Sequence, residues 1–179
     1  AARVMGTSDR IRLGIIGSGQ RGMYLMRRAN EVGDIDWVAV CDVWDLRRDQ
    51  AEQVAGTTLA KYVDYRHLLD RKDIDGVIIA TFDHVHAPMT ADAVRAGKDV
   101  FVEKPMTSLP MQGHDVVRAV RETKRIVQVG VQQRSTPHFI EAKQRFFDSG
   151  LIGRVNMVRT IWNANRGYLT QVPTSLDKK

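Results

Sequence analysis

The sequence contains one cysteine, five prolines and no apolar run that approaches the ~18 residues expected of a membrane-spanning helix. One cysteine cannot form a disulfide within the chain, so the fold does not depend on covalent cross-links. The sequence also lacks internal repeats and low-complexity segments, which argues against disordered and collagen-like proteins. Because 179 residues with 43% hydrophobic content can bury a sizeable core, we predict one globular domain, or one domain and part of another, without a membrane partner.

Acidic residues are scarce in the last third of the chain, and this scarcity accounts for the net charge of +6. Residues 1–120 contain 16 Lys and Arg against 17 Asp and Glu, whereas residues 121–179 contain 11 against 4. The basic residues of this last part are scattered, with no zinc-finger or aromatic RNA-binding signature among them. We interpret them as solvated surface and predict no nucleic-acid partner, with a nucleic-acid binder kept as an alternative that salt-dependent binding would reveal.

Strand-like and helix-like segments alternate over the first 130 residues. Short apolar runs indicate strands, and the segments between them repeat apolar residues at helical spacing. The expected strands are Ile11–Ile16, Trp37–Cys41, Leu59–Val63, Gly76–Ala80, Val100–Val102 and Ile126–Val131. This alternation is typical of a parallel sheet covered by crossover helices. We therefore predict an α/β fold built on a Rossmann-type doubly wound parallel sheet.

Proline and glycine mark the expected helix ends. The helix after the fourth strand is expected to carry Pro88 in its first turn and Gly97 just beyond its end, and Pro110 is expected to open the next helix. This pattern, with proline near the start and glycine past the end, supports the assignment of helices between the last three strands.

The segment after the sixth strand is short. Thr136–Pro137 is expected to begin a helix, and Val155–Trp162 is predicted as a strand with mixed faces. These elements are too few to bury a core of their own. We therefore assign residues 1–133 to a complete doubly wound domain and residues 134–179 to the incomplete start of a second domain.

A glycine-rich turn joins the first expected strand to the first expected helix. Its sequence is Gly17-Ser18-Gly19-Gln20-Arg21-Gly22, the GxGxxG spacing of dinucleotide-binding proteins in the required strand–turn–helix context. Gly17 permits the tight turn, Gly19 lets the backbone approach a pyrophosphate, and Gly22 allows close packing of helix on strand. The helix N-terminus would offer N–H groups to the phosphates, and Arg21 would add a positive charge.

An acidic residue follows the second expected strand. Asp42 lies 20 residues after Gly22, where its carboxylate would accept hydrogen bonds from the adenosine ribose and repel a 2′-phosphate. The turn and the acid together predict NAD rather than NADP, with Arg47 and Arg48 leaving NADP as the alternative. The structural alternative for both features is an ordinary turn with a solvated carboxylate.

Titratable residues also follow the fourth expected strand, at the sheet edge where ligands of open α/β sheets bind. They include His84 and His86, which lie two residues apart after Thr81. Because the third ligand and carboxylate of a familiar zinc motif do not stand at matching spacings, we predict no metal. His86 is the better functional candidate, since it is placed to orient the loop, and its alternative is a satisfied structural histidine.

Lys104 follows the fifth expected strand, with Glu103 before it and Pro105 after it. Pro105 restricts the backbone, and Glu103 would fix the lysine head group. A lysine so placed could donate a hydrogen bond to a substrate oxygen as negative charge develops there. A Glu–Lys pair that only ties down the loop is an equal alternative on sequence chemistry alone.

Several of these motifs together resemble the glucose–fructose oxidoreductase, inositol dehydrogenase and MocA-like family, over about residues 10–165. They are the glycine turn, Asp42, Ala80-Thr81…His86-Ala87, the run Ala96-Gly97-Lys98-Asp99-Val100-Phe101-Val102-Glu103-Lys104-Pro105, and Gly130-Val131-Gln132-Gln133-Arg134. The resemblance implies an NAD(P)-binding first domain in which Glu103-Lys104-Pro105 lines the nicotinamide and substrate side. It implies that Lys104 contacts the substrate hydroxyl, and that Thr81, His86 and the Gln132–Arg134 segment line the cofactor cleft.

The resemblance also implies a second domain, an open antiparallel sheet of an α+β domain with the substrate pocket, a catalytic Asp–His pair and the oligomer interface. No segment here matches the Asp-x-x-x-His helix of that domain, so this chain alone is expected to be inactive. The implied function is that of an NAD-dependent oxidoreductase acting on a secondary alcohol of a sugar, cyclitol or similar polyol, within a longer, homo-oligomeric parent. The alternatives are an NAD-dependent glycosidase that acts by transient oxidation and a non-catalytic dinucleotide-binding sensor or scaffold.

The segment Asp83-His84-Val85-His86-Ala87-Pro88 resembles bacterial members of the family that are exported by a twin-arginine route. The opening residues Ala1–Met5, without an initiator methionine, fit a mature or trimmed N-terminus, although no signal peptide is visible. We therefore expect a periplasmic rather than a cytoplasmic location.

Overall fold

The computed structural model of the protein describes residues 10–161. The chain divides into two compact units, Ala1–Gln133 and Arg134–Lys179. The first unit holds a six-stranded sheet in the order β3-β2-β1-β4-β5-β6, and all its neighbouring strands are parallel. The strands are β1 Ile11–Ile16, β2 Ile35–Cys41, β3 Ala60–Tyr62, β4 Gly76–Ile79, β5 Asp99–Glu103 and β6 Val127–Gly130. This order is that of a Rossmann fold, as predicted.

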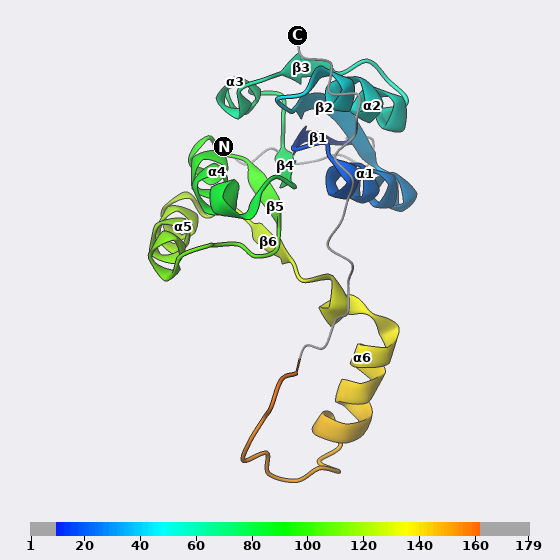
Figure 1. Cartoon of the computed structure of the whole chain (residues 1–179), viewed down its shortest axis with the longest axis vertical. Coiled ribbons are helices and arrows are strands. Elements are labelled where there is room, and N and C mark those ends of the chain that lie inside the picture. The colour runs from blue at the N-terminus through cyan, green and yellow to red at the C-terminus, as the bar shows by residue number, and fades with distance from the viewer. Residues whose placement is uncertain (1–9, 162–179) are drawn as a thin grey trace. The chain divides into compact units, whose positions relative to one another are not determined.

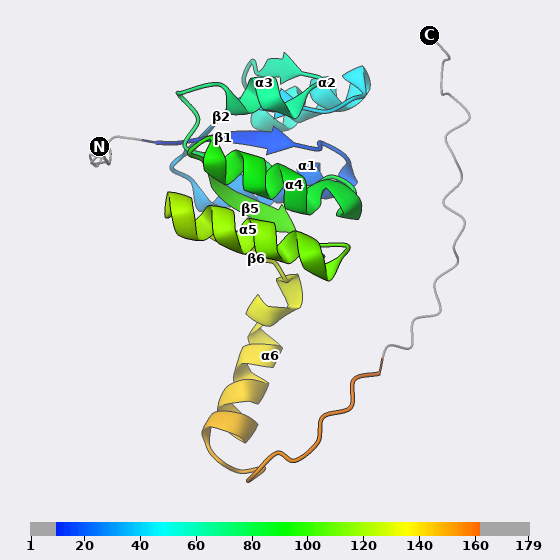
Figure 2. The ribbon, with the colours of Figure 1, turned by 90° about the vertical axis from the view of Figure 1, so that its left-hand side faces the viewer.

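Helices cover both faces of the sheet. Figures 1 and 2 show α4 and α5 side by side on one face and α1 with α2 on the other. The helices of this unit are α1 Gln20–Val32, α2 Asp45–Ala55, α3 Tyr65–Leu69, α4 Asp83–Arg95 and α5 Pro110–Thr123, followed by the 3-10 turn η1, Gln132–Ser135. Connections of this kind bring the carboxyl ends of all parallel strands to one edge of the sheet, which is the edge that matters for ligand binding.

Two apolar clusters hold these layers together, because successive residues of a strand point to opposite faces. Ile15 belongs to the cluster of Met26 in α1, whereas its neighbour Ile16 belongs to the cluster of Val94 in α4. Both isoleucines are almost completely buried. Burial on both faces explains why the sequence shows continuous apolar runs instead of alternation.

Pro88 is not in the first turn of its helix, so that prediction was wrong. α4 begins at Asp83, and Pro88 therefore lies inside the helix. Proline has no N–H, which leaves the carbonyl of His84, four residues earlier, without its helical donor. The start was misplaced because Phe82, the N-cap residue, provides no side-chain cap. The acidic Asp83 in the first turn was a weaker start signal than Pro88.

The second unit contains α6, Pro137–Ala142, which continues into the π-helical segment η2, Lys143–Asp148. The strand predicted at Val155–Trp162 is not formed over residues 154–161, and Trp162 lies outside the described residues. A strand needs a partner for its backbone N–H and C=O groups. Within residues 134–161 this unit has no other strand to supply one.

None of the helices between residues 10 and 161 is both long and apolar enough to cross a membrane.

Candidate functional site

The glycine turn lies between β1 and α1, and two of its glycines exclude any side chain. Gly17 has a φ of +87°, and a Cβ there would lie 2.6 Å from the carbonyl oxygen of Ala80. A Cβ on Gly22 would lie 2.1 Å from the carbonyl oxygen of Gly17. Gly19 differs, because a Cβ there would meet nothing within 4 Å. Gly17 and Gly22 therefore shape the turn, whereas Gly19 faces open space through which a ligand can approach the backbone.

Neither a side-chain cap nor an acidic residue of the first turn offsets the partial positive charge at the N-terminus of α1. Gly19 is the N-cap, it provides no side-chain cap, and the first turn contains no acidic residue. The first N–H groups of a helix have no intrahelical acceptor and carry a partial positive charge. Gln20, the first residue of the helix, is exposed. The end of α1 thus has the features of an anion-binding site.

Asp42 follows β2 and lies directly beside the glycine turn. Its Oδ2 accepts a hydrogen bond from the Ser18 backbone N–H at 2.8 Å and a longer one from the Ser18 hydroxyl at 3.3 Å. Its Oδ1 accepts one from the Trp44 N–H at 3.0 Å. A carboxylate offers about four lone-pair sites, so acceptor capacity remains for ribose hydroxyls. The turn and the acid, 24 residues apart at this contact, form one structural unit.

Arg47 and Arg48, the two arginines that left NADP as the alternative cofactor, have partners near Asp42. Arg48 donates to the backbone carbonyl of Asp42 at 2.5 Å and pairs with Asp45. The Arg47 guanidinium lies over the Trp44 ring, 5.2 Å from its centroid. Both guanidiniums are therefore placed around the backbone that follows β2.

Arg21 does not face open solvent as a free phosphate ligand. Its Nε and Nη2 each lie 2.6 Å from Oε1 of Glu103. The Glu103 side chain is only 6% exposed, so its carboxylate needs a counter-charge, and Arg21 supplies it. In this structure Arg21 neutralises Glu103, and its expected role beside the phosphates stays a prediction.

Glu103 also does not fix the Lys104 head group as expected. Its Oε2 accepts the backbone N–H of Lys104 at 3.2 Å. The Lys104 side chain is exposed. The loop after β5 thus presents a lysine at the carboxyl edge of the sheet while the neighbouring carboxylate holds the lysine's backbone.

His86 is 1% exposed, and its ring contacts the backbone rather than the open edge. Nδ1 lies 2.8 Å from the carbonyl oxygen of Pro105, and Nε2 lies 3.2 Å from that of Thr81. Thr81 is half-buried, and its hydroxyl donates to the sulfur of Met89 at 3.7 Å. In this structure His86 can therefore affect a ligand only through the segments it contacts.

The predicted site residues share one edge of the sheet. Each lies in the segment that follows the carboxyl end of a strand: the glycine turn after β1, Asp42 after β2, Thr81 after β4, Lys104 after β5, and the exposed Gln132 in η1 after β6. Within residues 10–161, no group of three or more His, Cys, Asp or Glu side chains is arranged to hold a metal ion.

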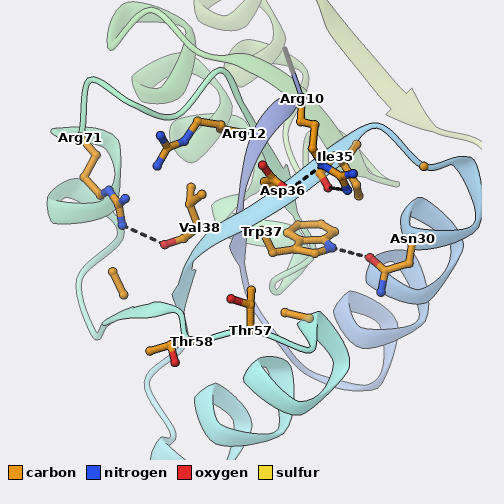
Figure 3. A pocket seen from close by; sticks show the side chains of 13 residues that line it. Arg10, Arg12, Asn30, Ile35, Asp36, Trp37, Val38, Thr57, Thr58 and Arg71 are labelled. Carbon is orange, nitrogen blue, oxygen red and sulfur yellow. Dashed lines mark hydrogen bonds and ion pairs between the residues drawn. The ribbon is translucent and has the colours of Figure 1, made fainter. Parts of the chain in front are cut away.

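A cavity of about 840 Å³ lies at the opposite edge, near the starts of β1 and β2 (Figure 3). Sequence reasoning did not find it. Its charges are paired internally: Arg10 contacts Asp36 at 2.7 Å, and Asp73 contacts both Arg12 at 2.5 Å and Arg71 at 2.6 Å. Because these guanidiniums already have carboxylate partners, the uncapped helix end and exposed lysine make the carboxyl edge the better candidate site.

Comparison with known proteins identifies the family of the chain. The model of an oxidoreductase family with an NAD-binding Rossmann fold matches residues 11–131. The inositol 2-dehydrogenase of Salmonella typhimurium is 35% identical over 150 residues, which are 83% of this chain and 44% of that protein. Inositol 2-dehydrogenase 2 of Saccharopolyspora erythraea is 32% identical over 164 residues, 91% of this chain and 48% of that protein. The chain therefore spans less than half the length of these relatives.

Solved structures show the same likeness. The myo-inositol 2-dehydrogenase of Lactobacillus plantarum superposes with a TM-score of 0.74 at 26% identity, over 82% of this chain and 43% of that one. The scyllo-inositol dehydrogenase of Lactobacillus casei, solved with NAD(H) and scyllo-inositol, gives 0.73 at 26% identity over 80% and 42%. With the fold, the glycine turn and a family model that matches most of the first unit, the chain belongs to the oxidoreductase family with an NAD-binding Rossmann fold.

Proposed function

We propose that this chain is the nucleotide-binding part of an NAD-dependent oxidoreductase that moves a hydride between nicotinamide and a secondary alcohol of a cyclitol, sugar or similar polyol. The observation that carries this proposal is the contact between Asp42 and the glycine turn, beside an uncapped helix N-terminus. These groups match the two ends of an adenosine diphosphate: N–H groups for the pyrophosphate and a carboxylate for the ribose.

The same contact favours NAD over NADP. A carboxylate at 2.8 Å from the Ser18 N–H is fixed at the turn and would meet the 2′-phosphate of NADP with like charge. Arg48 is engaged with the Asp42 carbonyl and Asp45, so its guanidinium is not aimed at a 2′-phosphate without giving up those partners. We therefore assign Gly17 to Gly22 to the pyrophosphate side of the cofactor and Asp42 to its ribose.

Lys104 is the residue proposed to meet the substrate. The cofactor supplies the hydride acceptor, and an exposed ammonium at the same sheet edge can donate a hydrogen bond to the alcohol oxygen as negative charge develops there. The relatives named inositol 2-dehydrogenase support a cyclitol substrate. A second domain, supplied by the rest of a longer parent that forms a homo-oligomer, would complete the pocket and take the proton.

The test is turnover by the whole parent protein. With NAD⁺ and myo-inositol it should form NADH, and Lys104→Ala should lower kcat by about 100-fold or more while NADH binding stays unchanged. Lys72→Ala is the matched control, because Lys72 is an exposed lysine in the loop that precedes β4, at the other edge of the sheet. Unchanged turnover in Lys104→Ala would refute the assigned role.

Two other outcomes would select the alternatives. Cleavage of a glycoside without net NADH formation would identify an NAD-dependent glycosidase. NADH binding with no turnover of any polyol or glycoside would favour a sensor or scaffold.

A further inference from the structure

Lys104 is exposed, and the residues on both sides of it make hydrogen bonds to other segments of the chain. On its N-terminal side, Glu103 accepts the Lys104 backbone N–H at 3.2 Å and is itself bound by Arg21. On its C-terminal side, the carbonyl of Pro105 lies 2.8 Å from Nδ1 of His86. The backbone is therefore restrained immediately before and after Lys104, whose side chain is exposed.

The imidazole ring of His86 that makes this contact is buried. Both ring nitrogens face carbonyl oxygens, which accept hydrogen bonds and cannot donate them. The shorter contact assigns a ring N–H to Nδ1, as donor to the Pro105 carbonyl. Since His86 is 1% exposed, water does not compete for that bond. The ring thereby fastens the loop after β5 to the first turn of α4.

The restraint by Arg21 reaches the loop from the glycine turn. Arg21 lies in the first turn of α1, and the carboxylate it holds is 82 residues away in the chain. The Glu103 carboxylate lies close to Gly130 in β6, since a Cβ added at this glycine would lie 3.1 Å from its Oε1. The arginine thus connects the helix end proposed for the phosphates with the loop proposed for the substrate.

We propose that His86 and Arg21 are positioning residues that hold the loop on both sides of Lys104, so that its ammonium lies against the nicotinamide end of bound NAD⁺. This inference rests on the proposed function and names the residues that set its geometry. Neither residue touches the substrate: each acts through a neighbour of Lys104.

The first experiment exchanges the two nitrogens of His86. His86→Asn places an amide N–H near the position of Nδ1, whereas His86→Gln places one near Nε2. In the 179-residue chain, Lys104 acetylation by an activated ester is measured by mass spectrometry with and without saturating NAD⁺. NAD⁺ should slow the acetylation of Lys104 in wild type and in His86→Asn. In His86→Gln this protection should be about fivefold smaller than in wild type.

The controls separate positioning from folding. His84→Asn alters an exposed histidine of the same helix turn and should leave protection unchanged. Thermal unfolding and NADH affinity are measured for every variant, and both should be similar for His86→Asn and His86→Gln. Equal protection in these two variants would overturn the assignment of His86.

The second experiment tests Arg21. Arg21→Gln should reduce the protection of Lys104 at saturating NAD⁺, whereas Arg27→Gln, an exposed arginine of the same helix, should not. If Arg21→Gln instead weakens NAD⁺ binding by about tenfold and leaves protection at saturation intact, Arg21 is a phosphate ligand and not a positioning residue.

The result for the wild-type chain distinguishes failure of the proposed function from failure of the positioning roles alone. Failure of wild type to bind NAD⁺, or binding without protection of Lys104, would refute the proposed function and this inference with it. Protection in wild type that persists in His86→Gln and Arg21→Gln would refute the positioning roles alone.

Discussion

The Asp42 carboxylate accepts a hydrogen bond from the Ser18 backbone N–H at 2.8 Å, so the end of β2 holds the middle of the glycine turn. The residue proposed to bind the cofactor ribose therefore also fixes the turn proposed to bind the pyrophosphate. Removal of this carboxylate is expected to affect both ends of the same ligand.

Two alanine substitutions in the glycine turn should affect different properties, one the stability of the fold and the other the binding of NADH. Gly22→Ala should destabilise the fold by about 1–3 kcal/mol or more, because its Cβ would lie 2.1 Å from the Gly17 carbonyl oxygen. Gly19→Ala should change stability by less than about 1 kcal/mol, since nothing lies within 4 Å, but should weaken NADH binding by obstructing the approach to the backbone. Urea unfolding and NADH titration measure the two effects. Equal stability of the two variants would contradict the account of the turn.

The thiol of Cys41 should be nearly unreactive in the folded protein. Burial, together with the nearby charges of Asp42 and Asp64, raises the pKa of this thiol to about 12. Near neutral pH its thiolate fraction is then roughly a thousandfold below that of an ordinary cysteine. A chromogenic aromatic disulfide should react slowly with the native chain and rapidly in urea. Similar rates under both conditions would show that Cys41 is accessible.

Asp73 should make stability depend on pH in the acid range. Its hydrogen bond from Arg71 holds its pKa at about 2, below the usual 3.8. A lowered folded-state pKa contributes stability above pH 3.8 that is lost as the pH falls towards 2. Asp73→Asn should remove this acid dependence and cost at most about 1 kcal/mol at neutral pH, because the side chain is 38% exposed.

Urea unfolding at several pH values measures this effect. Asp70→Asn is the control, since the Asp70 side chain is 82% exposed and lies 3.8 Å from its nearest cationic partner, His67. An Asp73→Asn variant with the acid dependence of wild type would contradict the prediction.

The parallel sheet, and the placement of the expected site residues at one edge of it, could be predicted because their signals are local. Buried strands appear as apolar runs, and the glycine turn with Asp42 stands at the spacing that a βαβ unit requires. The start of α4 was missed because Phe82 is not a capping residue, and Pro88 was given more weight than the acidic Asp83 of the first turn. The strand expected over residues 155–162 failed for a different reason, since strand pairing is not a property of one segment.

The contacts around Lys104 depend on tertiary structure and could not be read from local patterns. The pair between Arg21 and Glu103 joins residues 82 positions apart, and the contact between His86 and Pro105 joins residues 19 apart. One signal was available: a glutamate at the end of a buried strand needs a cation or donors to offset its burial. Sequence proximity pointed to Lys104 as that cation, whereas the fold supplies Arg21.

The glycine turn and Asp42 are proposed to bind NAD. We would titrate the 179-residue chain with NADH and with NADPH, and follow the quenching of tryptophan fluorescence, to which Trp44 beside Asp42 contributes. Wild type should bind NADH more tightly than NADPH, and Asp42→Ala should weaken NADH binding by about tenfold or more. Asp36→Ala, at the other end of β2, should bind as wild type does. Absence of binding, or NADH affinity unaffected by Asp42→Ala, would contradict the account.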